Sequence, residues 1–377
     1  MTTIKNNKRT PILNITSKVL ASICTMAMTT AWGNNLTVNN LTDLVSPGDG
    51  QCALREAITN ANTNSDASSG DCVVGADADT ITFSVGGTVL LGSTLSVSDA
   101  AGLTLDGADQ GVTLSGNHVV RVMQVNPGAN LTVKNLTVAN GLASVGGFVP
   151  PGGGGIYNQF GTLTVIGSTF SGNSSTGRGG GIANYGDAIS VANPGGNLTV
   201  INSTFSGNSA LNGGAIYSVL PGVANVVNST IVGNSALSGP PCPVGQICTG
   251  VQPAEGGGID SMGLLNLDNS IVAGNTVDNL FPSDIIGAAS SGSNNLIGDP
   301  GSAGGLQHGV NGNIVGVNVA TALNATLANN GGPTQTLALL TGSPAIDTAL
   351  AVKCPATDQR GESLFLRKLV LGIPAQS

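Results

Sequence analysis

The side chains that could cleave a glycosidic bond here are carboxylates, and the first candidates are Asp260 and Asp268. Inverting hydrolysis requires two carboxyl groups about 6.5–9.5 Å apart. In a repetitive chain, such a pair would need acids at the same position of neighbouring repeats. The counterparts of Asp260 are instead Tyr157, Ala183 and Tyr217. The repeats therefore give no indication of an acid pair.

A lyase would need a basic residue beside an acid-bound Ca²⁺. Within the repeats only Lys134 and Arg178 are available, and neither has an acid within four residues. We therefore expect a non-catalytic protein without a cofactor. A polysaccharide lyase or glycoside hydrolase remains the alternative, because one fold can support different functions.

Aromatic residues offer a second kind of site, since their rings can stack on sugars. Tyr157 and Tyr217 occupy the same position of two repeats, and Tyr185 lies close to that position. An exposed row of these three residues would bind a glycan. The same spacing also fits a structural tyrosine ladder along the face of a repeat protein, and this interpretation stays open.

The cysteines indicate disulfides, provided that the chain is exported to an oxidising compartment. Cys52 and Cys72 are the nearest pair at the N-terminal end, and Cys242 and Cys248 close a small loop. That loop is a second candidate for binding. Cys354 is left over, so free thiols remain an alternative. Zinc is disfavoured, because the chain has no Cys-x-x-Cys sequence and only two histidines.

Acidic residues crowd the sequence around Cys72. Asp71, Asp77 and Asp79 could hold Ca²⁺ together with nearby carbonyl groups. The alternative is a solvated acidic loop held by the Cys52–Cys72 disulfide. We favour that alternative, because no known calcium-loop spacing is present.

Internal repeats determine the elements that must position these residues. Two blocks alternate along the chain, and within each block apolar residues alternate with polar ones, which is typical of short strands. Gly and Asn between the runs favour tight turns. The blocks are LTVIGSTFSGN (163–173), LTVINSTFSGN (198–208), ANVVNSTIVGN (224–234) and LNLDNSIVAGN (265–275), with GGGIYN, GGGIAN, GGAIYS and GGGIDS between them.

These repeats predict a parallel β-helix with three short strands in each turn, stacked about 4.8 Å apart. One stack inside the coil should contain Ile156, Ile182, Ile216 and Ile259. A second should be an asparagine ladder of Asn173, Asn208, Asn234 and Asn275. The low aromatic content of 3% fits a narrow interior filled with branched aliphatic residues.

Insertions of unequal length occur at one corner of the coil, at Gly141–Gly152 and Ser235–Glu255. They should project from one side, where loops on a rigid scaffold often carry binding function. Insertions without any role are the alternative. At the N-terminal end, residues 52–62 predict a capping helix with Arg55 and Glu56 pointing away from the core or toward its rim.

The N-terminus has a charged start followed by the short apolar run Val19–Ala31, which predicts a signal peptide over residues 1–33. An N-terminal membrane anchor is the alternative. Cleavage would remove four of the 12 basic residues, leaving 8 against 20 acidic ones and a net charge of about −12. This balance argues against nucleic acids and other polyanions as partners.

Three segments resemble known bacterial surface proteins. CALREAITNAN (52–62) is similar to the CSLREA domain, and the GGAI and FxxN sequences are similar to repeats of polymorphic outer membrane proteins. Residues 329–349, together with TDQRG (357–361), resemble the choice-of-anchor Q region. The resemblance implies an all-β, right-handed, pectin-lyase-like β-helix on the cell surface or secreted, with adhesion as the suggested function.

The expected organisation is a signal peptide (1–33), a CSLREA-like cap (34–80), β-helix repeats (81–286), a choice-of-anchor-like end (287–361) and an atypical tail (362–377). The tail lacks the ending typical of that family, and we hypothesise a frameshift or truncation there. The expected partners are a glycan or a surface or matrix protein. No membrane span is expected beyond the signal peptide.

Overall fold

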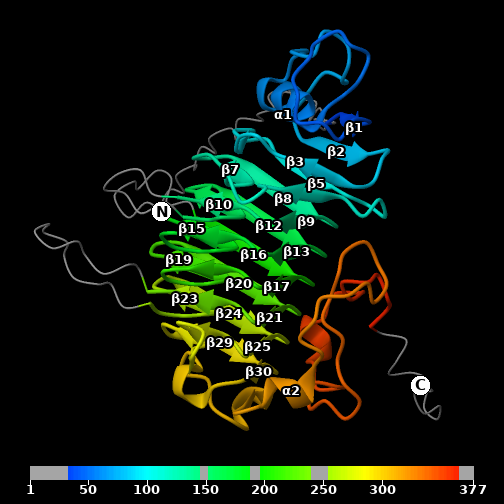
Figure 1. Ribbon diagram of the computed structural model, residues 1–377. Helices are drawn as coiled ribbons and strands as arrows, with labels where there is room; N and C mark the ends of the chain where they lie inside the picture. The colour runs from blue at the N-terminus through cyan, green and yellow to red at the C-terminus, as the bar shows by residue number, and fades with distance from the viewer. Residues whose placement is uncertain (1–32, 145–151, 187–195, 239–253, 365–377) are drawn as a thin grey trace, which may run out of the picture. The chain divides into compact units, whose positions relative to one another are not determined.

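Successive turns of one parallel β-helix make up most of the structure, a computed structural model that describes residues 33–144, 152–186, 196–238 and 254–364. Apart from one antiparallel pair, each strand pairs in parallel with the equivalent strand of the next turn, so stacked strands form long sheets (Figure 1). The predicted all-β parallel β-helix is confirmed. A typical turn has four strands rather than the expected three, because a two-residue strand precedes each glycine-rich block.

Sheets 1 and 2 follow each other along the chain and meet at an asparagine corner. Sheet 1 contains β1 (Asn35–Val38), β2 (Asp79–Phe83), β5 (Leu103–Asp106), β8 (Asn130–Lys134), β12 (Thr162–Ile166), β16 (Asn197–Ile201), β20 (Val223–Val227), β24 (Leu264–Asp268) and β29 (Ala289–Ser293). Sheet 2 contains β3 (Thr88–Leu90), β6 (Thr113–Ser115), β9 (Thr137–Ala139), β13 (Thr169–Ser171), β17 (Thr204–Ser206), β21 (Thr230–Val232), β25 (Ile271–Ala273), β30 (Leu296–Ile297) and β31 (Ile314–Val315).

Sheets 3 and 4 complete the turn. Sheet 3 contains β10 (Leu142–Ala143), β14 (Ser174–Ser175), β18 (Ser209–Ala210), β22 (Ser235–Ala236), β26 (Thr276–Val277) and, antiparallel to β26, β27 (Phe281–Pro282). Sheet 4 contains β4 (Leu95–Val97), β7 (Met123–Val125), β11 (Ile156–Gln159), β15 (Ile182–Tyr185), β19 (Ile216–Val219), β23 (Ile259–Ser261) and β28 (Ile285–Ile286).

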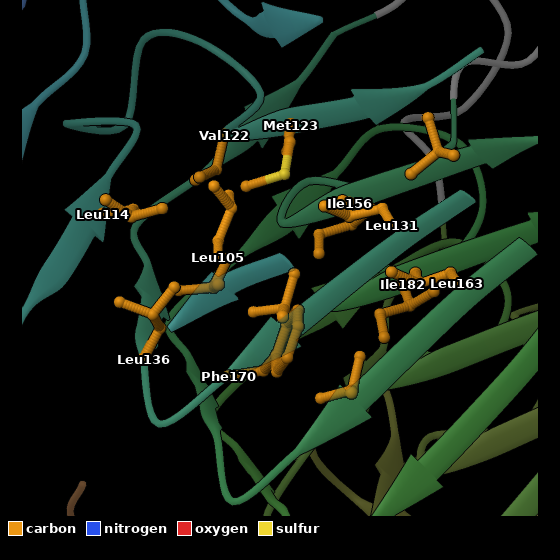
Figure 2. Close-up of a cluster of buried hydrophobic side chains, with 14 of the residues drawn as sticks. Leu105, Leu114, Val122, Met123, Leu131, Leu136, Ile156, Leu163, Phe170 and Ile182 are labelled. Carbon is orange, nitrogen blue, oxygen red and sulfur yellow. The ribbon is translucent and has the colours of Figure 1, made fainter. Parts of the chain in front are cut away.

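Aliphatic side chains fill the interior in rows, one residue from each turn (Figure 2). The register pairs Ile156 with Ile182, Ile182 with Ile216 and Ile216 with Ile259, as predicted. The rings of Phe170 and Phe205 stack with centroids 4.7 Å apart. Burying each such side chain contributes about 1.5–3 kcal/mol, so these rows supply most of the stabilisation.

The predicted asparagine ladder is also confirmed. Asn173 Nδ2 donates to Asn208 Oδ1 at 2.9 Å, and the same bond links Asn208 to Asn234 and Asn234 to Asn275. Asp284 ends the ladder as an acceptor for both the backbone and the side-chain N–H of Asn275. Each buried amide thereby finds partners in the neighbouring turns.

Glycine begins each glycine-rich block for a steric reason. Gly153, Gly179, Gly213 and Gly256 all have φ between +62° and +65°. A Cβ atom on any of them would lie within 2.7 Å of a backbone carbonyl oxygen three residues later. Only glycine fits this left-handed turn, and the turn fixes the direction in which sheet 4 starts.

The N-terminal helix α1 (Leu54–Thr63) caps the coil, and the predicted Cys52–Cys72 disulfide lies beside it. The expectation that Glu56 points away is wrong. Glu56 is buried and accepts a hydrogen bond from the backbone N–H of Ala53, because the N-terminus of a helix leaves such donors unsatisfied. It also accepts one from the backbone N–H of Ser46 in the preceding loop. Arg55 pairs with Asp43 at 2.8 Å.

The C-terminal segment, residues 317–364, folds back onto the outer side of sheet 2 (Figure 1). It contains the short helix α2 (Val319–Ala322) and a 3₁₀ turn at Ala351–Lys353, and 3₁₀ turns at Pro300–Ser302 and Val310–Gly312 precede it. Leu323 and Leu337 pack on Val232, where the outer side of the sheet is apolar. Further toward the N-terminal end, where that side carries threonines, the contacts are hydrogen bonds.

Candidate functional site

A strip of tyrosine, arginine and aspartate side chains runs along the outer side of sheet 4. The register pairs Tyr157 with Ala183, Ala183 with Tyr217 and Tyr217 with Asp260. Because the isoleucines beside them point inward, these residues point outward. The strip is defined as Arg121, Tyr157, Arg178, Tyr185, Tyr217 and Asp260.

The rings of the strip pack on one another and on the two guanidinium groups. Tyr185 contacts Tyr157 edge to face at 5.4 Å between centroids, and Tyr217 at 5.6 Å. Arg121 lies 4.9 Å from the centroid of the Tyr157 ring, and Arg178 lies 4.9 Å from that of Tyr217. Such cation–π contacts hold both groups in place.

Exposure limits what these rings can offer to a ligand. Tyr217 is completely buried, whereas Tyr157 and Tyr185 are partly exposed. An open row of three stacking rings is therefore not formed, although the three residues do lie together. The strip instead leaves Arg121, Tyr157 and Arg178 partly exposed, and guanidinium and phenol groups can form hydrogen bonds.

A second row of residues lies beside the strip. Backbone bridges join Gly152 to Arg178, Arg178 to Asn212 and Asn212 to Glu255, each four residues before the isoleucine of its glycine-rich block. This row brings Glu255 close enough to Asp260 to act on its ionisation. Glu255 is thus an acid whose charge acts on Asp260, which the comparison of strand positions alone did not reveal.

Asp260 is the most perturbed acid of the strip. Burial, and to a smaller extent the charge of Glu255, raises the pKa of its carboxyl group from 3.8 to about 6, while Arg178 and Asn212 oppose this change. Burial also raises the pKa of Tyr217 to about 12. At neutral pH the Tyr217 phenol is therefore protonated, and Asp260 is close to its titration point.

Two polar atoms of the strip are buried without a hydrogen-bond partner: Tyr185 Oη and Asp260 Oδ2. Among the described side chains the third such atom is Asp99 Oδ2. Arg178 lies close enough to Tyr185 to act on its pKa, but no bond of acceptable geometry forms. Each unsatisfied atom lowers the free energy of unfolding by about 1–3 kcal/mol. The protein is therefore less stable than it would be if these atoms had hydrogen-bond partners.

The sequence found the three tyrosines and Asp260 but missed the roles of Arg121 and Arg178. The signal for Arg178 and Glu255 was their shared position four residues before an isoleucine. Arg121 carries no comparable signal, because it precedes the first complete glycine-rich block. Cys242 and Cys248 lie outside the described residues.

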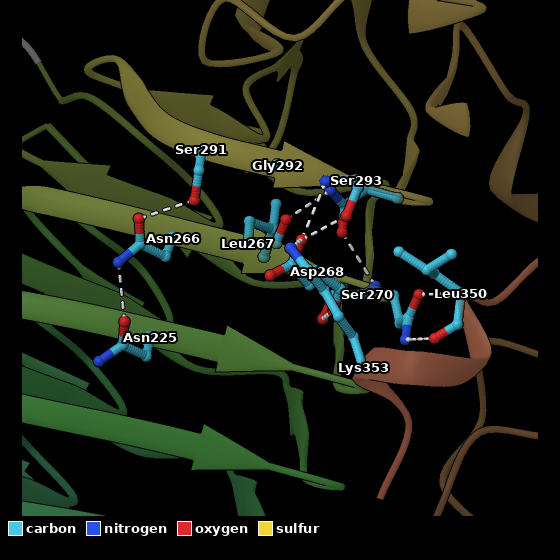
Figure 3. A network of polar contacts seen from close by, with 12 residues as sticks. Asn225, Asn266, Leu267, Asp268, Ser270, Ser291, Gly292, Ser293, Leu350 and Lys353 are labelled. Carbon is cyan, nitrogen blue, oxygen red and sulfur yellow. Dashed lines mark hydrogen bonds and ion pairs between the residues drawn. The ribbon is translucent and has the colours of Figure 1, made fainter. Parts of the chain in front are cut away.

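Asp268 belongs to a different network, on the outer side of sheet 1 (Figure 3). Its Oδ1 atom accepts from Ser293 Oγ at 2.6 Å and forms an ion pair with Lys353 Nζ at 2.8 Å. These contacts join β24 and β29 to the C-terminal segment, next to a hollow of about 480 Å³. The carboxylate therefore has a structural role in this network.

The acids proposed for calcium have other partners. Asp71 accepts hydrogen bonds from the backbone N–H groups of Gly48, Asp49 and Gly50, and Asp79 accepts them from Asn34 and Ala76. In the described ranges no three His, Cys, Asp or Glu side chains gather as a metal site. Calcium binding at Asp71, Asp77 and Asp79 stays a prediction.

No known protein-family model matches the chain, and no curated protein matches it. Among the helices that the structure describes, none is long and apolar enough to cross a membrane.

Proposed function

We propose that this chain is an exported, non-catalytic β-helix protein that binds a glycan of a cell surface or matrix through the strip on sheet 4. The observation that carries the proposal is the pair of buried, unpartnered atoms, Tyr185 Oη and Asp260 Oδ2, on one face of the coil. On binding, the side chains that cover these two atoms would move aside, and the hydroxyl groups of the ligand would then supply the partners that both atoms lack.

The geometry of the strip supports an extended ligand rather than a compact one. Arg121 and Asp260 belong to turns that are four strand spacings apart, or roughly 19 Å. Tyr157 and Tyr185, which lie between them, are partly exposed. Several sugar units in a row would contact the whole strip.

Export to the cell surface or beyond is supported by the Cys52–Cys72 disulfide, because such bonds persist in oxidising compartments. The signal sequence proposed for residues 1–33 and the resemblance to bacterial surface proteins support the same location. Cell fractionation with N-terminal sequencing of the product tests this part. Intact protein in the cytoplasm would contradict it.

The test of binding uses the purified chain with neutral and acidic polysaccharides on a size-exclusion column, recording both protein elution and polymer size. We expect co-elution with at least one unshortened polymer. Tyr185→Phe should weaken the binding, and Thr199→Val, on the outer side of sheet 1, should not. The proposal fails if no polymer is retained or if both variants bind like the parent.

Cleavage of the glycan is a second candidate, which the effect of Glu255 on the ionisation of Asp260 favours. A carboxyl group that holds its proton near pH 6 can act as a general acid, with the second carboxylate as base. Shortened polymer in the same experiment, absent with Asp260→Asn, would establish this activity. Unshortened polymer at pH 5–7 would exclude it for the polymers used.

A further inference from the structure

We infer that Arg121 binds a carboxylate of the glycan, so that the ligand contains an acidic sugar unit at that end of the strip. This inference rests on the proposed glycan binding and specifies the class of glycan. It comes from the contacts of Arg121, from a comparison with the other basic residues, and from the charge of the chain.

The contacts of Arg121 fix the guanidinium group but leave most of its donors unused. Nε donates to the carbonyl oxygens of Gly152 and Gly153 at 3.1 and 3.0 Å, and Nη1 donates to Gln124 Oε1 at 3.3 Å. A guanidinium has five N–H groups, so three have no partner among the described residues. They lie on the Nη edge, which binds carboxylates in a bidentate manner.

Arg121 is also the one residue among the lysines and arginines of the described ranges for which no carboxylate acts nearby. Six lysines and arginines lie in those ranges. Four form ion pairs with an aspartate, namely Arg55, Lys134, Lys353 and Arg360. Arg178 experiences the charge of Asp260. At Arg121 burial lowers the pKa, and only the Tyr157 ring opposes this change.

A mostly buried cation without a counter-ion is costly, and an anionic ligand removes that cost. The side chain is partly exposed, so a ligand can reach it. The Tyr157 ring, 4.9 Å away, keeps the group in place before binding. A ligand carboxylate at the Nη edge of Arg121 would accept two charge-assisted hydrogen bonds from the guanidinium group.

The excess of acidic residues in the chain, 20 against 12 basic ones, restricts the ligand further. Charges more than about 8 Å apart are largely screened at physiological salt, so the contact with Arg121 dominates for an isolated carboxylate. A densely charged polyanion would place further carboxylates beside Asp260 and Glu255. A glycan in which neutral units separate the acidic ones brings fewer such carboxylates to the strip, so this class is favoured.

The test compares two polymers by isothermal titration calorimetry. The first is hyaluronan, in which glucuronate alternates with N-acetylglucosamine, and the second is the same polymer with its carboxyl groups reduced. We expect the parent to bind hyaluronan at least tenfold more tightly. Arg121→Gln should lower that ratio to about one, and Arg121→Lys should keep part of it. Lys134→Gln, which removes one positive charge from sheet 1, should leave the ratio unchanged.

The possible results of this experiment distinguish a failure of the Arg121 inference from a failure of the proposed glycan binding. Equal binding of both polymers by the parent, or a preference that survives in Arg121→Gln, would overturn the inference and leave glycan binding intact. Binding of neither polymer, while a different neutral glycan binds, would also overturn it. Binding of no glycan at all would overturn both. Circular dichroism of each variant confirms that the β-sheet signal is retained.

Discussion

The outer sides of sheets 2 and 4 are built on the same coil and differ in how their polar groups are satisfied. On sheet 2 the C-terminal segment covers Thr169 and Thr204 and provides hydrogen-bond partners for both hydroxyl groups. Gln359 bonds to Thr169, Thr204 and Thr334 at 2.7–3.1 Å. On sheet 4, Tyr185 Oη and Asp260 Oδ2 are buried without partners among the described residues, and no described carboxylate forms an ion pair with Arg121.

The two faces therefore differ in how much their polar groups contribute to stability. Hydrogen bonds that are fully satisfied, as on sheet 2, contribute about 0.5–1.5 kcal/mol each and leave nothing for a ligand. The unsatisfied atoms of the strip on sheet 4 lower stability, and the proposed glycan binding would account for keeping them, because functional surfaces often trade stability for activity. The residues that resemble the choice-of-anchor motif, 357–361, thus have a direct physical role in holding the C-terminal segment against the coil.

The largest expected effect is a loss of stability when the apolar interior of the coil, on which both faces are built, is disrupted. Leu198 is completely buried in sheet 1, so Leu198→Asp places an unpaired charge among apolar side chains. We expect a loss of more than about 4 kcal/mol in the free energy of unfolding, or no folding at all. Urea denaturation measures this, with the outward-facing Thr199→Asp as the control. Cooperative unfolding at parental stability would mean that the inward register is wrong.

The second expected effect is a pH dependence of the free energy of unfolding, caused by Asp260 on sheet 4. The folded pKa of Asp260 is raised from 3.8 to about 6, so the folded chain binds this proton more tightly than the unfolded chain. Its contribution to stability is fully present below pH 3.8 and is lost as the pH rises through 6. Each pKa unit corresponds to about 1.4 kcal/mol, which gives roughly 3 kcal/mol.

Asp260→Asn should therefore be more stable than the parent at pH 7 and should show a smaller decrease between pH 4 and pH 7. Part of the decrease remains, because burial also raises the pKa of Asp284 to about 6. Guanidinium denaturation at the two pH values tests this. A variant with the same pH profile as the parent would show that Asp260 is not the titrating group.

A third, smaller effect belongs to sheet 2. Gln359→Ala leaves the buried hydroxyl groups of Thr169, Thr204 and Thr334 with fewer partners, and we expect a loss of about 1–3 kcal/mol. Glycan binding should not change. Gln307→Ala, at an exposed position, is the matched control. Unchanged stability of Gln359→Ala would mean that the C-terminal segment does not dock as described.

The repeats carried enough information to predict the interior but not the partners of the outer faces. The isoleucine stack and the asparagine ladder follow from spacing, because equivalent residues in adjacent turns must meet. The contacts of Gln359 with the coil join residues that are 155–191 positions apart, and no repeat relates them. The fourth strand was missed since it is only two residues long, and Glu56 was misplaced because the helix N-terminus needs an acceptor.

The strip on sheet 4 was predicted in part, because some of its residues occupy equivalent positions of the repeats and others do not. Tyr157 and Tyr217 share a repeat position, so their alignment could be foreseen. The burial of Tyr217 and the contacts of Arg121 depend on how the rings and guanidinium groups pack, which spacing does not determine.

The most direct test of the contrast between the two faces is the effect of Tyr185→Phe on both stability and glycan affinity. Removing an unpartnered buried hydroxyl should raise the free energy of unfolding by about 1 kcal/mol and should weaken binding. Tyr217→Phe is the control, because Tyr217 Oη has a partner in Met262 Sδ at 3.7 Å. A Tyr185→Phe variant that is less stable than the parent and binds the glycan equally well would contradict the account.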